Sequence, residues 1–206
     1  MNGATSAVTS GEGTPQSPRY YEGTAEIRDD VHQRRRYFTY RTGDVLVAGY
    51  AGSVMFTIDR PARDVWPCLK DFNLWQSSHR HYYSGVVGDL EGKTFRLSSE
   101  PNDSGPHQYD VIRVIPEHLI VISQPVPKDG ANGGVSPGFH VFMLNEHGGK
   151  TIVTILLEHA IGTTDKTEEQ AVEYWRAMTP EFQMKWRDIF IPNLKKLVLQ
   201  GRQSGT

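Results

Sequence analysis

Four residues of this 206-residue chain have the types and positions needed for acid–base chemistry: His79, His81, Asp110 and His140. An imidazole changes charge near neutral pH, so a positioned histidine can take a proton from a substrate or from water. A carboxylate bonded to that imidazole would hold it in the productive tautomer. We therefore predict that Asp110 orients a histidine and that His79, His81 or His140 is the catalytic base.

The inward orientation of Asp110 rests on strand alternation. In an expected strand at 108–115, Asp110 lies on the face opposite Arg113, and arginine prefers solvent, so Asp110 would face the interior. Composition does not settle which way His140 points. The structural alternative is that His140 is a hydrogen-bonded residue without a catalytic role and that Asp110 faces water.

His79 and His81 lie two residues apart in a polar loop. On an extended segment both would point the same way, and a third ligand such as Asp110, Glu158 or His159 could complete a zinc or iron site. Because the motif is short, we expect no metal and place this loop at the mouth of a cavity. We also expect no cofactor, since the chain has no Walker-type phosphate loop.

A second set of residues is mostly apolar or aromatic and falls on faces that could line an interior. We predict that the following residues contact a small hydrophobic, aromatic or heterocyclic ligand: Trp75, Phe95, Leu97, Phe142, His159, Trp175, Met178 and Phe182. The alternative is that these side chains are ordinary core. Cys68, the single cysteine, is expected to be a buried, inert thiol.

Hydrophobic periodicity predicts the elements that would position these residues. A strand at 53–58 is followed by two short helices within 61–75. Six further strands, separated by turn signals, are expected at 82–90, 93–99, 108–115, 119–124, 139–146 and 151–159. A long amphipathic helix begins at the capping box Thr167–Gln170 and ends at Gly201, with bends at Pro180 and Pro192.

This order of elements predicts an α+β, helix-grip fold: a curved seven-stranded antiparallel sheet wrapped round a long C-terminal helix, with two short helices after the first strand. Such a sheet needs a cover for its apolar face, and only the C-terminal helix is long enough. The sheet must curl round that helix and leave an apolar space that opens among the loops.

Several segments resemble the START-like, or SRPBCC, superfamily. Val54–Trp75, VMFTIDRPARDVWPCLKDFNLW, is similar to its opening strand and helix pair. Further similar segments are GKTFRLS, DVIRVIPEHLIVIS, GGKTIVTILLEH and the closing-helix segment IFIPNLKKLVLQG. The superfamily includes birch-pollen-allergen-like proteins, polyketide cyclases and aromatases, and lipid-transfer domains. The resemblance covers residues 50–200 and implies the helix-grip fold, but the superfamily has no universal catalytic motif.

Composition excludes several classes of protein. The chain has 22 basic and 24 acidic residues, a net charge of −2, so it lacks the basic surplus typical of nucleic-acid binders. Its apolar runs are much shorter than the roughly 20 residues of a membrane span. One cysteine excludes an internal disulfide and a multi-cysteine zinc site. With no apolar block in the first 18 residues to suggest a secretory signal, we predict a cytoplasmic protein without nucleic-acid or membrane partners.

Three segments are expected along the chain. Residues 1–18 are predicted to be a disordered tail, because their composition offers little to bury. Residues 19–48 are predicted to be an N-terminal extension or an oligomerisation arm. Within it, residues 19–44 are expected to form a short helix and a strand that pack on the main body or on a second copy. Residues 49–201 are predicted to be the START-like ligand-binding or catalytic domain.

These observations favour a cofactor-independent enzyme that uses histidine and aspartate for acid–base chemistry. It would be a cyclase or dehydratase, or a hydrolase that activates water against an electron-poor ring. One alternative is a carrier or sensor of a lipid or hydrophobic metabolite, and another is a partner-binding module based on 19–44. A titratable pair inside the cavity and within hydrogen-bonding reach would favour the enzyme.

Overall fold

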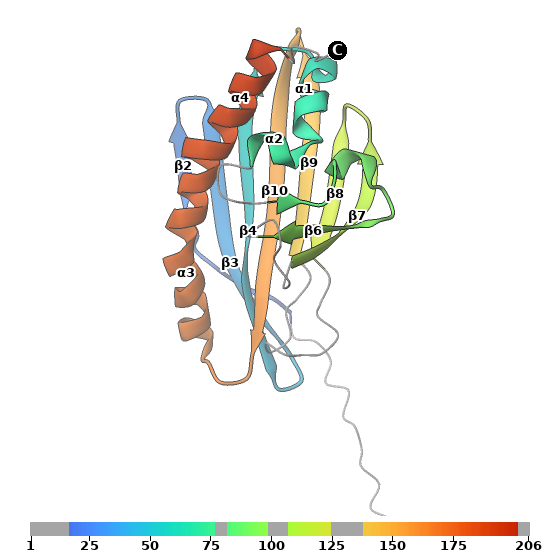
Figure 1. Ribbon diagram of the computed structural model, residues 1–206. Coiled ribbons are helices and arrows are strands. Elements are labelled where there is room, and N and C mark those ends of the chain that lie inside the picture. The colour runs from blue at the N-terminus through green and yellow to red at the C-terminus, as the bar shows by residue number, and fades with distance from the viewer. Residues whose placement is uncertain (1–16, 77–81, 99–106, 125–137, 202–206) are drawn as a thin grey trace, which may run out of the picture.

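A single antiparallel sheet curves along one side of a long C-terminal helix in the computed structural model, which describes residues 17–76, 82–98, 107–124 and 138–201 (Figure 1). Within these ranges the sheet has ten strands: β1 (Arg19–Tyr21), β2 (Ala25–Arg28), β3 (Val31–Thr42), β4 (Val45–Ile58), β5 (Tyr82–Tyr83), β6 (Thr94–Ser98), β7 (His107–Ile115), β8 (Leu119–Gln124), β9 (Gly138–His147) and β10 (Lys150–Thr163). Their order is β1-β3-β4-β10-β9-β8-β7-β6-β5, and β2 also pairs with β3.

The helical elements cover the concave face of this sheet. They are α1 (Ala62–Leu69), α2 (Phe72–Trp75), the short 3-10 helix η2 (Val87–Asp89), α3 (Glu168–Lys185), the π-helical segment η3 (Trp186–Phe190) and α4 (Ile191–Gln200). Figure 1 shows α3 and α4 as one continuous helix along the sheet. The predicted α+β, helix-grip fold with two short helices after the opening strand is therefore confirmed, with ten strands instead of seven.

The additional strands come from the N-terminal segment. Residues 19–44 were predicted as a short helix and a strand, but they contain the three strands β1, β2 and β3, so the predicted helix was wrong. β3 alternates from Val31 to Tyr37, but its inward positions include Gln33 and Arg35, which donate hydrogen bonds to carbonyl groups of α3. Polar residues on the inner face conceal the alternation that identifies a half-buried strand.

The opening strand is also longer than expected, because β4 begins at Val45 and not at residue 53. It crosses the boundary predicted between residues 48 and 49 and pairs with β3 from Thr42↔Val45 to His32↔Met55. Residues 19–42 are thus built into the sheet of their own chain. A role of 19–48 in oligomerisation stays a prediction.

The predicted strand at 82–90 is mostly not a strand. Only Tyr82–Tyr83 pairs with β6, and the chain then turns into η2. Gly85 lies between them with a φ of 151°, a conformation that L side chains rarely adopt. Glycine here permits the change of direction that ends the pairing.

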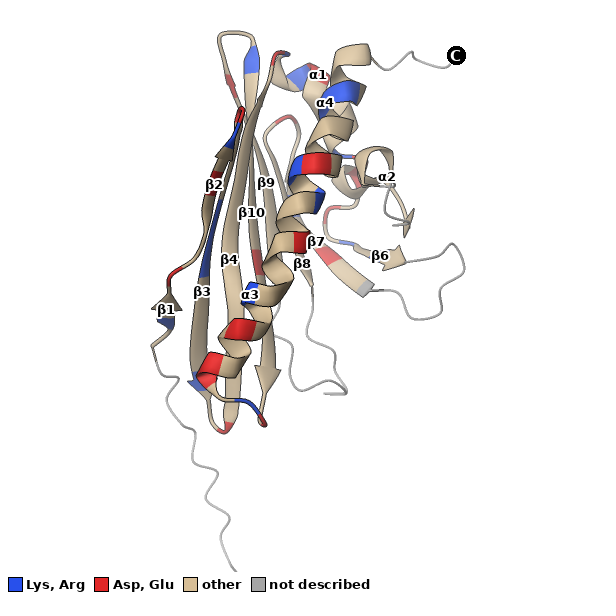
Figure 2. Ribbon diagram, turned by 90° about the vertical axis from the view of Figure 1, so that its left-hand side faces the viewer, with Lys and Arg blue, Asp and Glu red and all other residues tan. Residues whose placement is uncertain are grey.

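The C-terminal helix begins as predicted. The Thr167 hydroxyl accepts a hydrogen bond from the Gln170 backbone N–H, and the Gln170 side chain accepts one from the Thr167 N–H. The helix widens into a π-helical turn directly before Pro192, which cannot donate a backbone hydrogen bond. Charged residues of both signs lie along its outer side (Figure 2).

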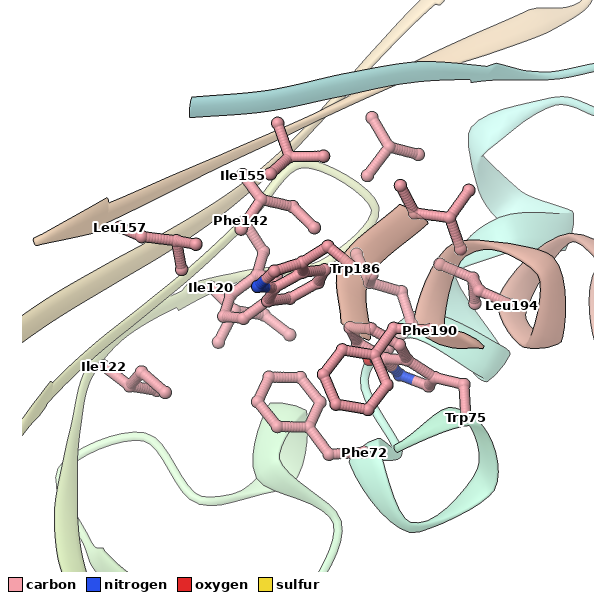
Figure 3. Close-up of a cluster of buried hydrophobic side chains, with 14 of the residues drawn as sticks. Phe72, Trp75, Ile120, Ile122, Phe142, Ile155, Leu157, Trp186, Phe190 and Leu194 are labelled. Atoms are coloured by element: carbon pink, nitrogen blue, oxygen red, sulfur yellow. The ribbon is translucent and has the colours of Figure 1, made fainter. Parts of the chain in front are cut away.

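A core of buried aromatic and aliphatic side chains lies between the sheet and the helices (Figure 3). Trp75 from α2 packs in this core against Phe142 of β9 and against Trp186 and Phe190 of the C-terminal helix. These contacts fix the end of the helix nearest α1 and α2. The described helices include none that is long and apolar enough to cross a membrane.

Candidate functional site

Two histidines meet on the concave face of the sheet. β9 and β10 pair so that His140 lies opposite Leu157, and His159 is two residues further along β10 on the same face. Their Nε2 atoms are 2.8 Å apart, within hydrogen-bonding distance. One ring must donate an N–H to the unprotonated nitrogen of the other.

Both imidazoles are held in their neutral form. Protein atoms surround each ring on nearly all sides, and the resulting loss of hydration lowers both pKa values. The pKa of His159 falls to about 4, mainly through burial and further through the positive charge of Arg35. The pKa of His140 is also well below its usual value, through burial and the neighbouring ring. By residue, His140 and His159 are both half-buried.

Aromatic side chains enclose this histidine pair. The rings of Tyr50 and Phe182 lie 5.3 and 6.1 Å from that of His159, and Tyr109 lies 6.1 Å from that of His140. Burial raises the pKa of Tyr109 to about 12 and raises the pKa of Tyr50 as well. Both phenols therefore stay protonated at neutral pH and can donate hydrogen bonds, while the imidazoles can accept a proton.

Among the described residues no histidine bonds to Asp110, and its predicted inward orientation was wrong. A β-bulge at Ile112 places two residues of β7 opposite one of β8, because Val111 pairs with Ile122 and Arg113 with the next residue, Val121. The extra residue reverses the alternation, so Arg113 and Asp110 both lie on the outer face. There Asp110 accepts a 2.6 Å hydrogen bond from the hydroxyl of Thr94.

The other predicted site residues divide into three groups. His79 and His81 lie outside the described residues. Trp75, Phe95, Phe142 and Trp175 are almost fully buried in the core cluster. Leu97, Met178 and Phe182 are half-buried. Contact of these seven apolar residues with a ligand stays a prediction.

An open hollow lies further along β10, and neither His140 nor His159 is among its lining residues. It has a volume of about 470 Å³ and lies between the start of β4, the end of β10 and the first turns of α3. Ile161, which shares a strand face with His159, lines it together with Ala48, Ala171, Tyr174 and Trp175. The Trp175 indole N–H donates to the Ala48 carbonyl at 2.8 Å and holds this wall in place.

Sequence reasoning placed His159 among the ligand contacts and missed it as the partner of His140. The hairpin turn at 147–150 could have revealed this pairing. Counting along both strands from the pair His147↔Lys150 places His140 opposite Leu157, two residues from His159 on the adjacent strand. Tyr50 and Arg35 were missed because the strand character of 31–52 was not recognised. Among the described residues, no group of three or more His, Cys, Asp or Glu could hold a metal ion.

No known protein-family model and no curated protein matches the chain. Solved structures do match. A truncated norcoclaurine synthase from Thalictrum flavum has a TM-score of 0.50 at 13% identity, covering 76% of this chain and 97% of that one. Protein BH1534 from Bacillus halodurans has a TM-score of 0.50 at 18% identity, covering 71% and 94%. Together with the strand order and the long closing helix, these matches show that the chain has the START-like, or SRPBCC-like, helix-grip fold.

Proposed function

We propose that this protein is a cofactor-independent enzyme that takes a proton from a small aromatic or heterocyclic compound, with the His140–His159 pair as its base. The observation that carries the proposal is the 2.8 Å contact between the two Nε2 atoms on the concave face. A histidine pair thus replaces the histidine–aspartate pair expected from the sequence.

The paired rings suit this role because they share one proton. The ring that donates its Nε2 proton has a free lone pair on Nδ1, which can accept a proton from the substrate. The shared proton can then move to the second ring, so the positive charge is spread over both imidazoles. The lowered pKa values keep both rings unprotonated at neutral pH and so available to accept a proton, at the expense of base strength.

The reaction class that we favour is cyclisation with dehydration. The base removes a proton from a carbon next to a carbonyl group, the resulting enolate attacks a second carbonyl within the molecule, and water leaves from the adduct. The protonated phenols of Tyr50 and Tyr109 are donors for the oxygen that becomes negative. The same base could activate water for hydrolysis at an electron-poor ring. Norcoclaurine synthase has the same fold and is by its name an enzyme, which supports an enzymatic role for this chain by analogy of fold.

The hollow between β10 and the first turns of α3 suits a small aromatic compound. The hollow of about 470 Å³ lies within the range typical of small-molecule sites. Apolar and aromatic residues of β4, β10 and α3 form one part of its wall, and residues 162–166, which include Asp165 and Lys166, form the rest. Trp175, predicted from the sequence as a ligand contact, is part of that wall. We propose that the ligand occupies this hollow with its reactive end toward His159.

The base can be tested without knowing the natural substrate. In the ring opening of 5-nitrobenzisoxazole, a base removes one C–H proton, the N–O bond breaks and a coloured cyanophenolate forms. We expect the protein to accelerate this reaction and His140→Gln and His159→Gln each to lower kcat/KM by about a hundredfold. His118→Ala is the matched control, since His118 is an exposed histidine at the β7–β8 turn.

The pH profile gives a second readout. The rate should be constant near neutral pH and fall only as the pH approaches the pKa of His159 near 4, instead of near 6.5 as for an exposed histidine. If the protein binds the compound but does not accelerate its ring opening over the rate in buffer, the result would support the alternative function, a non-catalytic carrier. Unchanged rates in both glutamine variants would remove the pair from the mechanism.

A further inference from the structure

Arg35 is a buried cation for which the structure provides no acidic partner. It lies on β3, faces α3 and is 7% exposed. Its Nη1 donates a 2.6 Å hydrogen bond to the Thr179 carbonyl, and its guanidinium lies 5.2 Å from the centre of the Tyr50 ring. In the part of the chain that the structure describes, Arg35 has no ion pair, and its other guanidinium N–H groups have no hydrogen-bond partner.

This arrangement is costly if Arg35 serves only to pack α3 on the sheet. Removing a cation from most of its water without a counter-ion is unfavourable, whereas a methionine side chain would fill a similar volume without that penalty. The carboxylate of Glu26, whose charge acts on Arg35, is itself bound to Arg187 at 2.7 Å. The guanidinium therefore has donors and positive charge left for a ligand.

The position of Arg35 relates it to the histidine pair. Arg35 pairs with Gly52, Gly52 with Leu157, and Leu157 with His140, so these four residues form one row across the sheet. Gly52 has no side chain, and a Cβ atom there would lie 3.3 Å from Cγ of Arg35. The arginine stem thus lies over the bare Gly52 backbone, and its positive charge acts on His159.

We propose that Arg35 binds an anionic oxygen of the ligand, so that the substrates of this site are small aromatic or heterocyclic carboxylates. This inference rests on the proposed function and adds the substrate class. Arginine suits the task because its planar fork keeps its charge when buried and matches the two oxygens of a carboxylate. The anion would also neutralise the buried cation next to the base.

The test compares two ligands that differ in charge and not in shape, 2-naphthoate and 2-naphthamide. Isothermal titration calorimetry with the full chain should show that naphthoate binds at least tenfold more tightly. Arg35→Met should weaken naphthoate binding by at least tenfold and leave naphthamide binding within twofold. Arg34→Met is the matched control, since Arg34 is the exposed neighbour on the opposite face of β3. This variant should bind both ligands as the wild type does.

The outcomes separate this inference from the proposed function. If the wild type binds naphthamide as tightly as naphthoate, the role of Arg35 is refuted while the aromatic site stands. If neither compound binds, the ligand site itself is refuted and the role of Arg35 with it. Should Arg35→Met fail to fold, Arg35→Gln can still donate to the Thr179 carbonyl and should lose the preference for naphthoate. A folded variant that keeps this preference would also overturn the proposal.

Discussion

Acidification from pH 7 to pH 5 should weaken the folded state, and the buried histidine pair should cause much of the loss. The pKa of His159 is about 4 in the folded chain and about 6.5 in the unfolded chain. Between these values the unfolded chain binds more protons, so the free energy of unfolding falls as the pH falls. At about 1.4 kcal/mol per pH unit below 6.5, His159 accounts for about 2 kcal/mol by pH 5. The lowered pKa of His140 acts in the same direction.

The assay is urea unfolding followed by tryptophan fluorescence at pH 7 and pH 5, for the wild type and His159→Gln. The glutamine keeps a hydrogen-bonding group but cannot titrate, so its loss of stability should be about 2 kcal/mol smaller. Carboxylates with lowered pKa values, such as Asp30, stay ionised at pH 5. Glu158, whose pKa is raised, contributes with the opposite sign but is present in both proteins. Equal losses in the two proteins would refute the argument that the pair is buried and neutral.

Three further perturbations test separate parts of the structure. Arg35→Met should raise the pKa of His159 above about 4, because a nearby positive charge is removed, and an unchanged value in an NMR titration of the imidazoles would contradict this. Gly49→Ala should lower the free energy of unfolding in urea by at least about 2 kcal/mol, because its Cβ would lie 2.2 Å from a backbone oxygen. Gly52→Ala, whose Cβ would have its nearest atoms at 3.3 Å, should lower it by less than about 1 kcal/mol. Similar losses in the two variants would show that the strands adjust freely. Tyr37→Phe should cost about 1 kcal/mol in thermal unfolding, because its buried hydroxyl donates a 2.8 Å hydrogen bond to a threonine of α3, and an unchanged midpoint would exclude that bond in solution.

The sequence predicted best those elements whose signals are local. β8 lies at 119–124 as expected, and the C-terminal helix starts at the capping box formed by Thr167 and Gln170. Both signals involve residues within a few positions of each other. Alternation is less robust, because a single extra residue such as Ile112 reverses every orientation beyond it. For that reason Asp110 was assigned to the wrong face.

The histidine pair and Arg35 depend on contacts between distant segments. His140 and His159 meet through the register of a hairpin, and Arg35 approaches them only because β3 pairs with β4. An inward arginine in a strand looks like an exposed one until the helix that accepts its hydrogen bond is placed against it. No local pattern contains that information.

The pairing of β3 has a consequence for how two copies of this chain could meet. Its free side is already covered by its own chain, since β2 pairs with residues 31–34, the Arg35 backbone N–H donates to the Thr24 carbonyl, and β1 pairs with residues 37–39. The strands that end up outermost are only two to four residues long. A neighbouring molecule therefore finds few unused amide and carbonyl groups on which to continue the sheet. Any association through this margin would depend on side chains and not on exchange of strands.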